Sequence, residues 1–211
     1  MKAAVHFKRE GAGLWIEAAY AILVQEGHKG LTIERLTTVT GKTRGSFYHH
    51  FGSVDGFTTR LLDDWREQNT ERIARLAATD PEPSSRRALV HREAVRLDAR
   101  IEIAIRRWAG ADGEVLGACQ AVDRRRMDML VRDLVALALN KGCTLRVGEA
   151  ELLARLEYAA FVGGQMLAPE GKLAALPDIG SLYDEMLDAF LERQRAASEQ
   201  PRLSVSRGAA E

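Results

Sequence analysis

The 211-residue sequence is 46% hydrophobic and carries 30 basic and 30 acidic residues, so its formal net charge is zero. This composition supports a substantial apolar core and excludes a protein that coats nucleic acid with a uniformly basic surface. The charge is uneven, because residues 1–60 carry eight Lys or Arg against five Asp or Glu. A mildly basic N-terminal part suits local contact with phosphates.

The sequence has no run of about 18 uncharged apolar residues, the length that a membrane helix needs. Its first residues do not have the pattern of a signal peptide, and we therefore expect a cytoplasmic protein. The two cysteines, Cys119 and Cys143, lack the spacing of metal ligands and are expected to be buried and reduced. We predict no metal site and no cofactor.

Apolar residues recur at helical spacing along the chain, whereas the alternation typical of β-strands is nearly absent. The sequence therefore predicts an all-α fold. In the N-terminal part, helices are expected over residues 14–26, 33–38 and 44–50. Gly27 would end the first of these helices, and Thr32 and Thr43 would cap the other two.

Longer helical patterns follow. They extend over residues 54–78, 86–109, 114–140, 149–167 and 179–197. Ser53 can cap the first of them, and a loop is expected around Pro169, Gly171 and Pro177. We predict a three-helix domain over residues 1–53, a helical body over 54–198, and a disordered tail over 199–211.

Residues 32–51, TIERLTTVTGKTRGSFYHHF, carry the clearest signal in the sequence. A short helix, a turn at Gly41 and a second short helix rich in polar and cationic side chains indicate a helix-turn-helix. Phe47 and Phe51 are one helical turn apart, and we expect them to anchor the second helix to the core.

The remaining side chains of that second helix suit a DNA duplex. Arg44 can contact guanine O6 and N7 or a phosphate. The hydroxyls of Thr43, Ser46 and Tyr48 can donate to phosphate oxygens, and Gly45 lets the backbone approach closely. The first N–H groups of the helix, that of Ser46 included, are expected to point toward anionic oxygens.

Residues 15–57 resemble the DNA-binding domain of the TetR/AcrR regulators, through the stretches WIEAAYAILVQEGHKGLTIERL and TRGSFYHHFGSVDGF. The order of elements is similar to that family over the whole chain. The resemblance implies a dimeric repressor that a small-molecule effector releases from a palindromic operator, and a place on the nucleoid when DNA is bound. The DNA-binding residues that we predict are Thr32, Lys42, Thr43, Arg44, Gly45, Ser46, Tyr48 and His49.

The sequence departs from the family pattern at four positions. Lys42 stands in the turn, where an apolar residue is usual. Thr37 and Thr40 replace Ala on the packed face of the first short helix, and Val54 replaces a Lys that commonly contacts phosphate. These departures leave open whether DNA affinity is reduced.

The resemblance places an effector site and a dimer interface in the helical body. Pockets for small molecules are mostly apolar with a few polar groups, and the effector-contact candidates are Trp65, His91, Arg100 and Trp108. Apolar stripes with small residues mark the helices over 149–167 and 179–197. These stripes fit either core burial or a homodimeric four-helix bundle, and the resemblance favours the homodimer.

Two other classes of protein remain open. The first is a helical interaction protein that has reduced or lost DNA binding, to which the departures from the family pattern give weight. The second is an all-helical enzyme, but the sequence contains no metalloprotease, P-loop or nucleophile-elbow motif. We therefore predict a regulator and not an enzyme.

Overall fold

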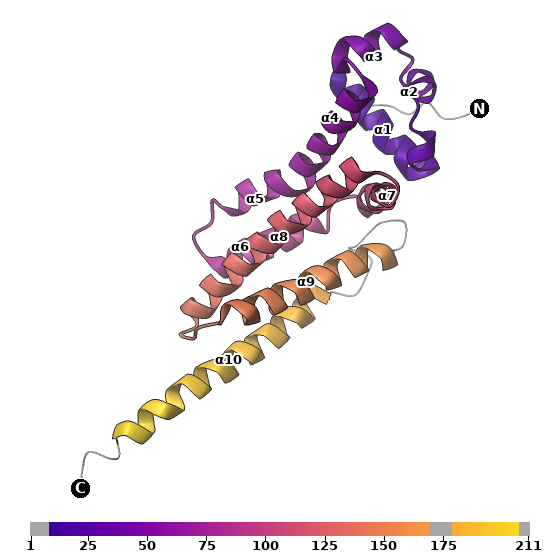
Figure 1. The fold of residues 1–211 in the computed structure, drawn as a ribbon. Helices are drawn as coiled ribbons and strands as arrows, with labels where there is room; N and C mark the ends of the chain where they lie inside the picture. The colour runs from indigo at the N-terminus through magenta and orange to yellow at the C-terminus, as the bar shows by residue number, and fades with distance from the viewer. Residues whose placement is uncertain (1–8, 169–178, 207–211) are drawn as a thin grey trace. The chain divides into compact units, whose positions relative to one another are not determined.

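The computed structural model describes residues 9–168 and 179–206, with the side chains of the last helix described as far as residue 197. Within these ranges the chain forms helices and no strand (Figure 1). The predicted all-α class is thereby confirmed. None of the helices in the described part is both long and apolar enough to cross a lipid bilayer.

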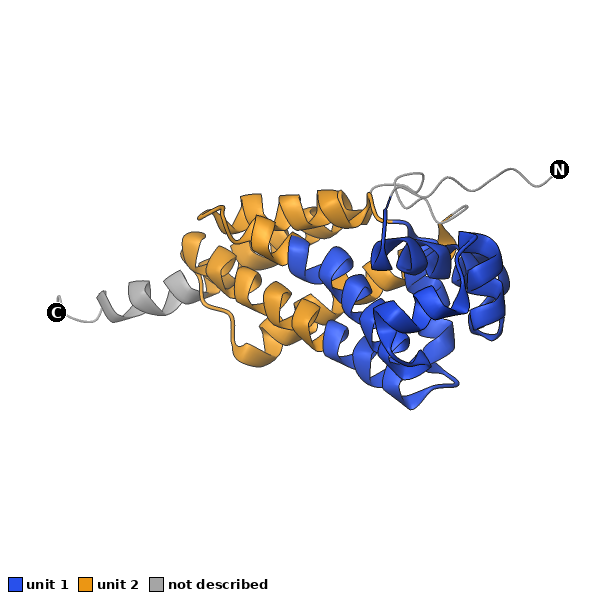
Figure 2. Cartoon of the chain, turned by 90° about the horizontal axis from the view of Figure 1, so that it is seen from above, with its two compact units in different colours: residues 1–72, 98–123 blue, residues 73–97, 124–211 orange. Residues whose placement is uncertain are grey.

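The chain divides into two compact units, each built from two separate stretches (Figure 2). Unit 1 comprises residues 1–72 and 98–123, and unit 2 comprises residues 73–97 and 124–211. The division at residues 53 and 198 that the sequence suggested stays a prediction.

Unit 1 contains the N-terminal helices. They are α1 (Ala12–Glu26), η1 (His28–Gly30), α2 (Ile33–Thr40), α3 (Arg44–Phe51), α4 (Val54–Arg66) and the π-helical turn η2 (Glu67–Glu71). The second stretch adds α7 (Ala99–Ala109) and the first part of α8 (Gly113–Asn140). A single apolar cluster joins both stretches, and its largest members include Trp15, Phe47, Leu61, Trp65 and Ile105.

Hydroxyl caps start three consecutive helices of unit 1, as the sequence predicted. The side chains of Thr32, Thr43 and Ser53 each accept a hydrogen bond from the backbone N–H three residues further on, at 3.2, 3.2 and 2.9 Å. Such a bond satisfies one of the N–H groups that a helix start leaves unpaired. Gly27 follows α1 with φ of 73°, a conformation that glycine adopts without steric cost.

The long helix predicted over residues 54–78 is interrupted by the π turn η2, after which α5 (Arg72–Ala77) continues. A π turn shifts the hydrogen-bond register by one residue. The apolar spacing of so short a segment fits both registers, which is why the sequence did not reveal the π turn.

The prediction of a single helix over residues 86–109 is wrong. The structure has two helices there, α6 (Pro83–Ala94) in unit 2 and α7 in unit 1, separated at residues 95–98. The Asp98 side chain accepts from the N–H of Arg100 at 3.0 Å and so caps a new helix. Helix α6 begins earlier than predicted because a proline fits the first helical turn.

Unit 2 holds the remaining part of α8 together with α9 (Val147–Leu167) and α10 (Ile179–Ser206). Helix α10 continues past residue 197, so the tail predicted to be disordered is helical as far as Ser206. The predicted loop with Pro169, Gly171 and Pro177 lies outside the described residues, as do residues 207–211. The core of unit 2 includes Leu134, Cys143, Ala150, Ala154, Tyr183, Leu187 and Leu191.

A buried arginine joins three helices of unit 2. Arg87 of α6 pairs with Glu157 of α9 at 2.8 Å and with Asp184 of α10 at 2.9 Å. Its Cζ atom lies 5.7 Å from the centre of the Tyr183 ring, at cation–π distance. Burial raises the pKa of Glu157 even though Arg87 favours the carboxylate. The three helices therefore share one ionic connection inside the unit.

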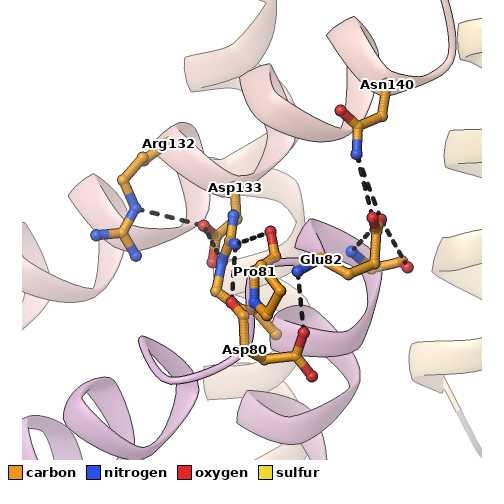
Figure 3. A network of polar contacts seen from close by, with 8 residues as sticks. Asp80, Pro81, Glu82, Arg132, Asp133 and Asn140 are labelled. Carbon is orange, nitrogen blue, oxygen red and sulfur yellow. Dashed lines mark hydrogen bonds and ion pairs between the residues drawn. The ribbon is translucent and has the colours of Figure 1, made fainter.

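A second polar network fixes the start of α6 against α8 (Figure 3). The Arg86 guanidinium donates to Asp133 at 3.0 Å and to the carbonyl oxygens of Asp80 and Pro81 at 3.1 and 2.8 Å. Asp133 is buried, with 3% of its surface exposed, and Arg132 also pairs with it at 3.3 Å. Removing this carboxylate would leave a largely buried guanidinium without its main counter-charge.

We expect Asp133→Ala to lower the free energy of unfolding by about 3 kcal/mol, because breaking a buried ion pair leaves an uncompensated charge. Asp63→Ala is the matched control, since the Asp63–Arg66 pair is about half exposed on both sides. That control should change stability by about 0.5 kcal/mol or less. Urea unfolding followed by circular dichroism measures both, and equal losses would contradict a special role of Asp133.

Candidate nucleic-acid interface

Helix α3 rests on an aromatic base, as its predicted anchors require. Phe47 is completely buried, and its ring centre lies 5.5 Å from that of Trp15 and 5.1 Å from that of Phe57. Phe51 lies 5.2 Å from Phe47 on the same side of the helix. These contacts fix how α3 is rotated about its axis and so determine which side chains face outward.

The predicted DNA-binding residues all belong to unit 1. They occupy the start of α2, the turn and the exposed face of α3. Ser46 is half-buried, and the others are exposed: Thr32, Lys42, Thr43, Arg44, Gly45, Tyr48 and His49. Tyr48 keeps 47% of its surface in solvent although it adjoins the buried Phe47. Their contact with DNA stays a prediction.

The caps of α2 and α3 affect which groups remain available to a phosphate. Thr32 and Thr43 use their hydroxyl oxygens as acceptors, so each hydroxyl hydrogen can still be donated to a ligand. The N–H of Ser46, however, is bonded to Thr43, and the expectation that it points toward an anion is wrong. The first two N–H groups of α3 and the Ser46 hydroxyl remain for that purpose.

Arg44 has a partner that the sequence does not indicate. Its Nη2 pairs with Oε1 of Glu34 in the first turn of α2, and the two side chains are 62% and 68% exposed. No sequence signal identifies this pair, because the two residues belong to different helices and lie ten positions apart. The pair spans the turn of the helix-turn-helix.

The departures from the family pattern are accommodated in α2. The hydroxyls of Thr37 and Thr40 donate to the carbonyl oxygens of Glu34 and Leu36, at 2.8 and 2.7 Å. Both polar side chains are thus satisfied by their own helix, and the apolar Leu36 keeps its buried position. Val54, at the start of α4, is 49% exposed and presents an apolar surface where the family pattern has a Lys.

Helix α4 is held on two sides by polar contacts within unit 1. Asp64 accepts from Arg9 at 2.9 Å and from the hydroxyl of Tyr20 of α1 at 3.0 Å. Burial, reinforced by the Asp64 charge, raises the pKa of Tyr20, so its hydroxyl remains a donor. On the other side, the indole N–H of Trp65 donates to Glu102 of α7 at 3.2 Å.

Glu102 is itself buried, with 2% of its surface exposed. It accepts from Arg106 one turn later in α7 at 2.9 Å, and Arg106 also pairs with Asp123 of α8 at 2.7 Å. Trp65, Glu102, Arg106 and Asp123 thus form a chain of polar contacts that runs from α4 through α7 to α8. The sequence pattern indicates Trp65 as a candidate but gives no sign of the carboxylate that receives its N–H.

The effector-contact candidates are divided between the units. Trp65 and Trp108 belong to the buried core of unit 1, and Trp108 stacks on His28 with ring centres 6.4 Å apart. Arg100 is exposed in the same unit and pairs with Asp98 at 2.6 Å. His91 lies in unit 2, exposed, beside Gly180, whose lack of a side chain makes room for the imidazole. Their role in effector binding stays a prediction.

The described residues contain no cluster of three or more His, Cys, Asp or Glu that could hold a metal ion. Cys119 and Cys143 are both buried, as predicted, and neither forms a disulfide in the structure. Burial raises the pKa of the Cys143 thiol, and its Sγ donates to the carbonyl oxygen of Ala138 at 3.4 Å.

Comparison of the sequence with known proteins gives a limited match. No family model matches the chain. Two curated proteins are each 29% identical over 75 residues, namely the HTH-type transcriptional repressors AcnR of Corynebacterium efficiens and Corynebacterium glutamicum. The matched part covers 32% of this chain and 40% of each relative, so the chain spans less than half the length of these relatives.

Solved structures similar to this one match nearly the whole chain. SCO4454, a TetR-family transcriptional regulator from Streptomyces coelicolor, has a TM-score of 0.64 and 16% identity, covering 88% of this chain and 96% of its own. NemR of E. coli in its reduced form has a TM-score of 0.62 and 18% identity, with coverages of 87% and 95%. A Rhodococcus sp. RHA1 protein of unknown function has a TM-score of 0.53 and 19% identity, with coverages of 93% and 98%.

The chain therefore has the fold of the TetR-family transcriptional regulators. This finding confirms the resemblance that the segments of residues 15–57 indicated, and it extends the resemblance from the helix-turn-helix to the helical body.

Proposed function

We propose that the protein is a dimeric transcriptional repressor that binds a palindromic operator and leaves it when a small molecule binds the helical body. The main observation behind this proposal is the outer face of α3, where an arginine, a tyrosine and a histidine lie exposed on a rigid aromatic base. The matched repressors and the TetR-family fold support the same function. A regulator of this kind would act in the cytoplasm, on the nucleoid.

DNA recognition is assigned to α3 and the two residues before it. Arg44 at the start of the helix can form paired hydrogen bonds with guanine O6 and N7 in the major groove. Tyr48 lies one turn further on, so its hydroxyl and that of Thr43 are available to phosphates on either side of the contacted base. Lys42 adds a charge in the turn and offsets the cation that Val54 does not supply.

Dimerisation is assigned to α9 and α10 in unit 2. Leu152 and Leu156 of α9 are 68% and 51% exposed, and Leu182 and Met186 of α10 are 58% and 55% exposed. Side chains such as Ala154 face the core, so these helices are apolar on the outward as well as the inward side. An apolar patch of this kind on a protein surface favours a partner, and a second copy would bury it by twofold symmetry.

A dimer also meets a requirement of operator binding. Two recognition helices about 34 Å apart enter successive major grooves on one side of the duplex. Gly163 on α9 lies where an added Cβ would meet no atom within 4 Å, so a neighbouring helix could approach closely there. The palindromic operator follows from the twofold symmetry of the dimer.

Effector response is assigned to the contacts that hold α4. An effector acts by binding one of two arrangements of the protein more tightly than the other. A ligand that binds unit 1 more tightly in one arrangement of α7 would stabilise that arrangement. Because Trp65 of α4 donates to Glu102 of α7, α4 would shift with α7. Asp64 would pass this shift to α1, which packs against α3 through Trp15 and Phe47.

An interaction protein with reduced DNA binding is the second candidate. Two features favour it. Val54, which is 49% exposed, stands where the family pattern has a Lys, and the exposed carboxylate of Glu34 is paired with Arg44. An enzyme is not proposed, because the matched proteins are regulators.

In gel-shift and footprinting assays with the DNA that flanks its own gene, the protein should protect a palindromic site. Arg44→Ala and Tyr48→Ala should together abolish the specific shift, since each contact contributes about 1–3 kcal/mol of binding or discrimination. Lys29→Ala is the control, because this exposed lysine lies outside the helix-turn-helix. Only weak, sequence-independent binding by the wild type at physiological salt would support the interaction protein instead.

Light scattering should give the mass of a dimer for the wild type and of a monomer for the double variant Leu152→Arg/Met186→Arg. The substitutions place charges on the outward apolar face of α9 and α10, where their burial between two copies is costly. Leu139→Arg is the matched control, since Leu139 is 60% exposed in α8. A variant that remains dimeric, or a wild type that is monomeric, would refute this interface.

A screen of metabolites should find a compound that raises the melting temperature and releases operator DNA. Trp65→Phe removes the N–H that contacts Glu102, and we expect about tenfold more compound to be needed for release, the effect of losing one buried hydrogen bond. Tyr183→Phe is the control, because it also removes one hydrogen-bond donor from a buried aromatic side chain, the hydroxyl that donates to the carbonyl oxygen of Leu153 at 2.9 Å, but in unit 2. If both variants lose only stability and release DNA at the same concentration of compound as the wild type, Trp65 has a role in core packing alone.

A further inference from the structure

We propose that Glu34 is a positioning residue that sets DNA specificity through Arg44. It holds the guanidinium for contact with a base edge and disfavours docking on DNA without that contact. This inference rests on the proposed DNA-binding function and deepens it, because it names a residue of α2 that determines how well operator is distinguished from other DNA.

The backbone around Glu34 is firmly held. Its carbonyl oxygen accepts from the hydroxyls of Thr37 and Thr38, each at 2.8 Å. Thr32 caps the same turn, and Leu36 is buried beneath it. The carboxylate therefore projects from a fixed point toward α3, although the side chain itself is 68% exposed.

Arg44 gains order from this pairing. A free arginine loses considerable rotamer entropy when it is fixed in one orientation. Pairing of its Nη2 with Glu34 restricts the guanidinium before DNA arrives, which reduces the entropy lost on binding. The guanidinium has further N–H donors that the pair does not use, and these can form the two hydrogen bonds to guanine O6 and N7.

The same carboxylate opposes non-specific binding. Non-specific complexes depend on the neutralisation of phosphates by Lys and Arg. If Arg44 turned to a phosphate, Glu34 would lose its partner and remain as an unpaired negative charge beside the polyanion. When Arg44 contacts a base, its pair with Glu34 stays intact. Glu34 therefore weakens non-specific binding more than it weakens binding to the operator. Specificity is this difference between the two affinities.

The pair contributes little to folding, because exposed ion pairs are weakly stabilising in water. Glu34→Gln should therefore fold normally, and its effect can be measured in DNA binding. A second pair supplies the matched control. Arg35 donates to Glu26 at 2.8 Å, and this pair lies between α1 and α2, apart from α3. Glu26→Gln removes an equal charge from the same unit without touching Arg44.

The experiment compares the full-length variants on operator DNA and on a scrambled duplex of equal length and composition. Fluorescence anisotropy at a fixed salt concentration gives the dissociation constant for each. We expect Glu34→Gln to bind the scrambled duplex several-fold more tightly and the operator no better, so that the specificity ratio falls about tenfold, the discrimination that a well-placed arginine provides. Glu26→Gln should change the ratio less than about twofold.

Three outcomes would overturn the inference. Glu34→Gln could tighten both duplexes equally, which indicates a general charge effect, or it could change neither. Glu34→Gln could also lower the ratio as strongly in an Arg44→Ala background, which would show that Glu34 does not act through Arg44. A wild type without preference for any duplex refutes the proposed function itself, whereas a specific wild type with an unchanged Glu34→Gln ratio refutes this inference alone.

Discussion

The proposed DNA-binding surface depends on the buried ring contacts of Phe47. Its ring lies among those of Trp15, Phe51 and Phe57, and it is completely withdrawn from water. Helix α3 has only eight residues, and a helix of this length is not stable in water without tertiary contacts. Because this aromatic cluster holds α3 in place, the residues on its other side can be polar and exposed.

The polar contacts around α4 complement this apolar support. Asp64 connects α4 to Tyr20, and Trp65 connects it to the buried Glu102. A buried carboxylate is costly unless its hydrogen bonds and counter-charge are in place, so the neighbours of Glu102 constrain α4 and α7 closely. Apolar packing thus positions the DNA-facing helix, and charged groups determine how α4 is connected to α7.

The sequence was sufficient to predict what depends on local chemistry. Thr32, Thr43 and Ser53 are recognisable as caps because a hydroxyl before an apolar periodic run satisfies free N–H groups of a helix start. Phe47 is recognisable as an anchor by its spacing from Phe51. These signals lie within a few residues of one another, and each has one physical explanation.

Contacts between helices far apart in sequence were not predictable in this way. The partner of Arg44 could have been any nearby carboxylate, and only the angle between α2 and α3 selects Glu34. The same holds for Glu102, which the sequence pattern places on a helix but not beside Trp65. The sequence does not reveal the break at residues 95–98, because Asp98, which caps α7, lies within a run that is helical by composition.

The apolar cluster that encloses Phe47 also contains Ile105 and Val122, which come from a stretch of chain that begins at residue 98. The unit that carries the proposed DNA-binding helix is therefore not formed by one continuous stretch of chain. A fragment ending after α4 would expose apolar surface that α7 and α8 normally cover. Exchange of DNA specificity between related regulators, whether by recombination or in the laboratory, would keep a sound interior only if both stretches were transferred together or if the exchange were confined to the outer face of α3.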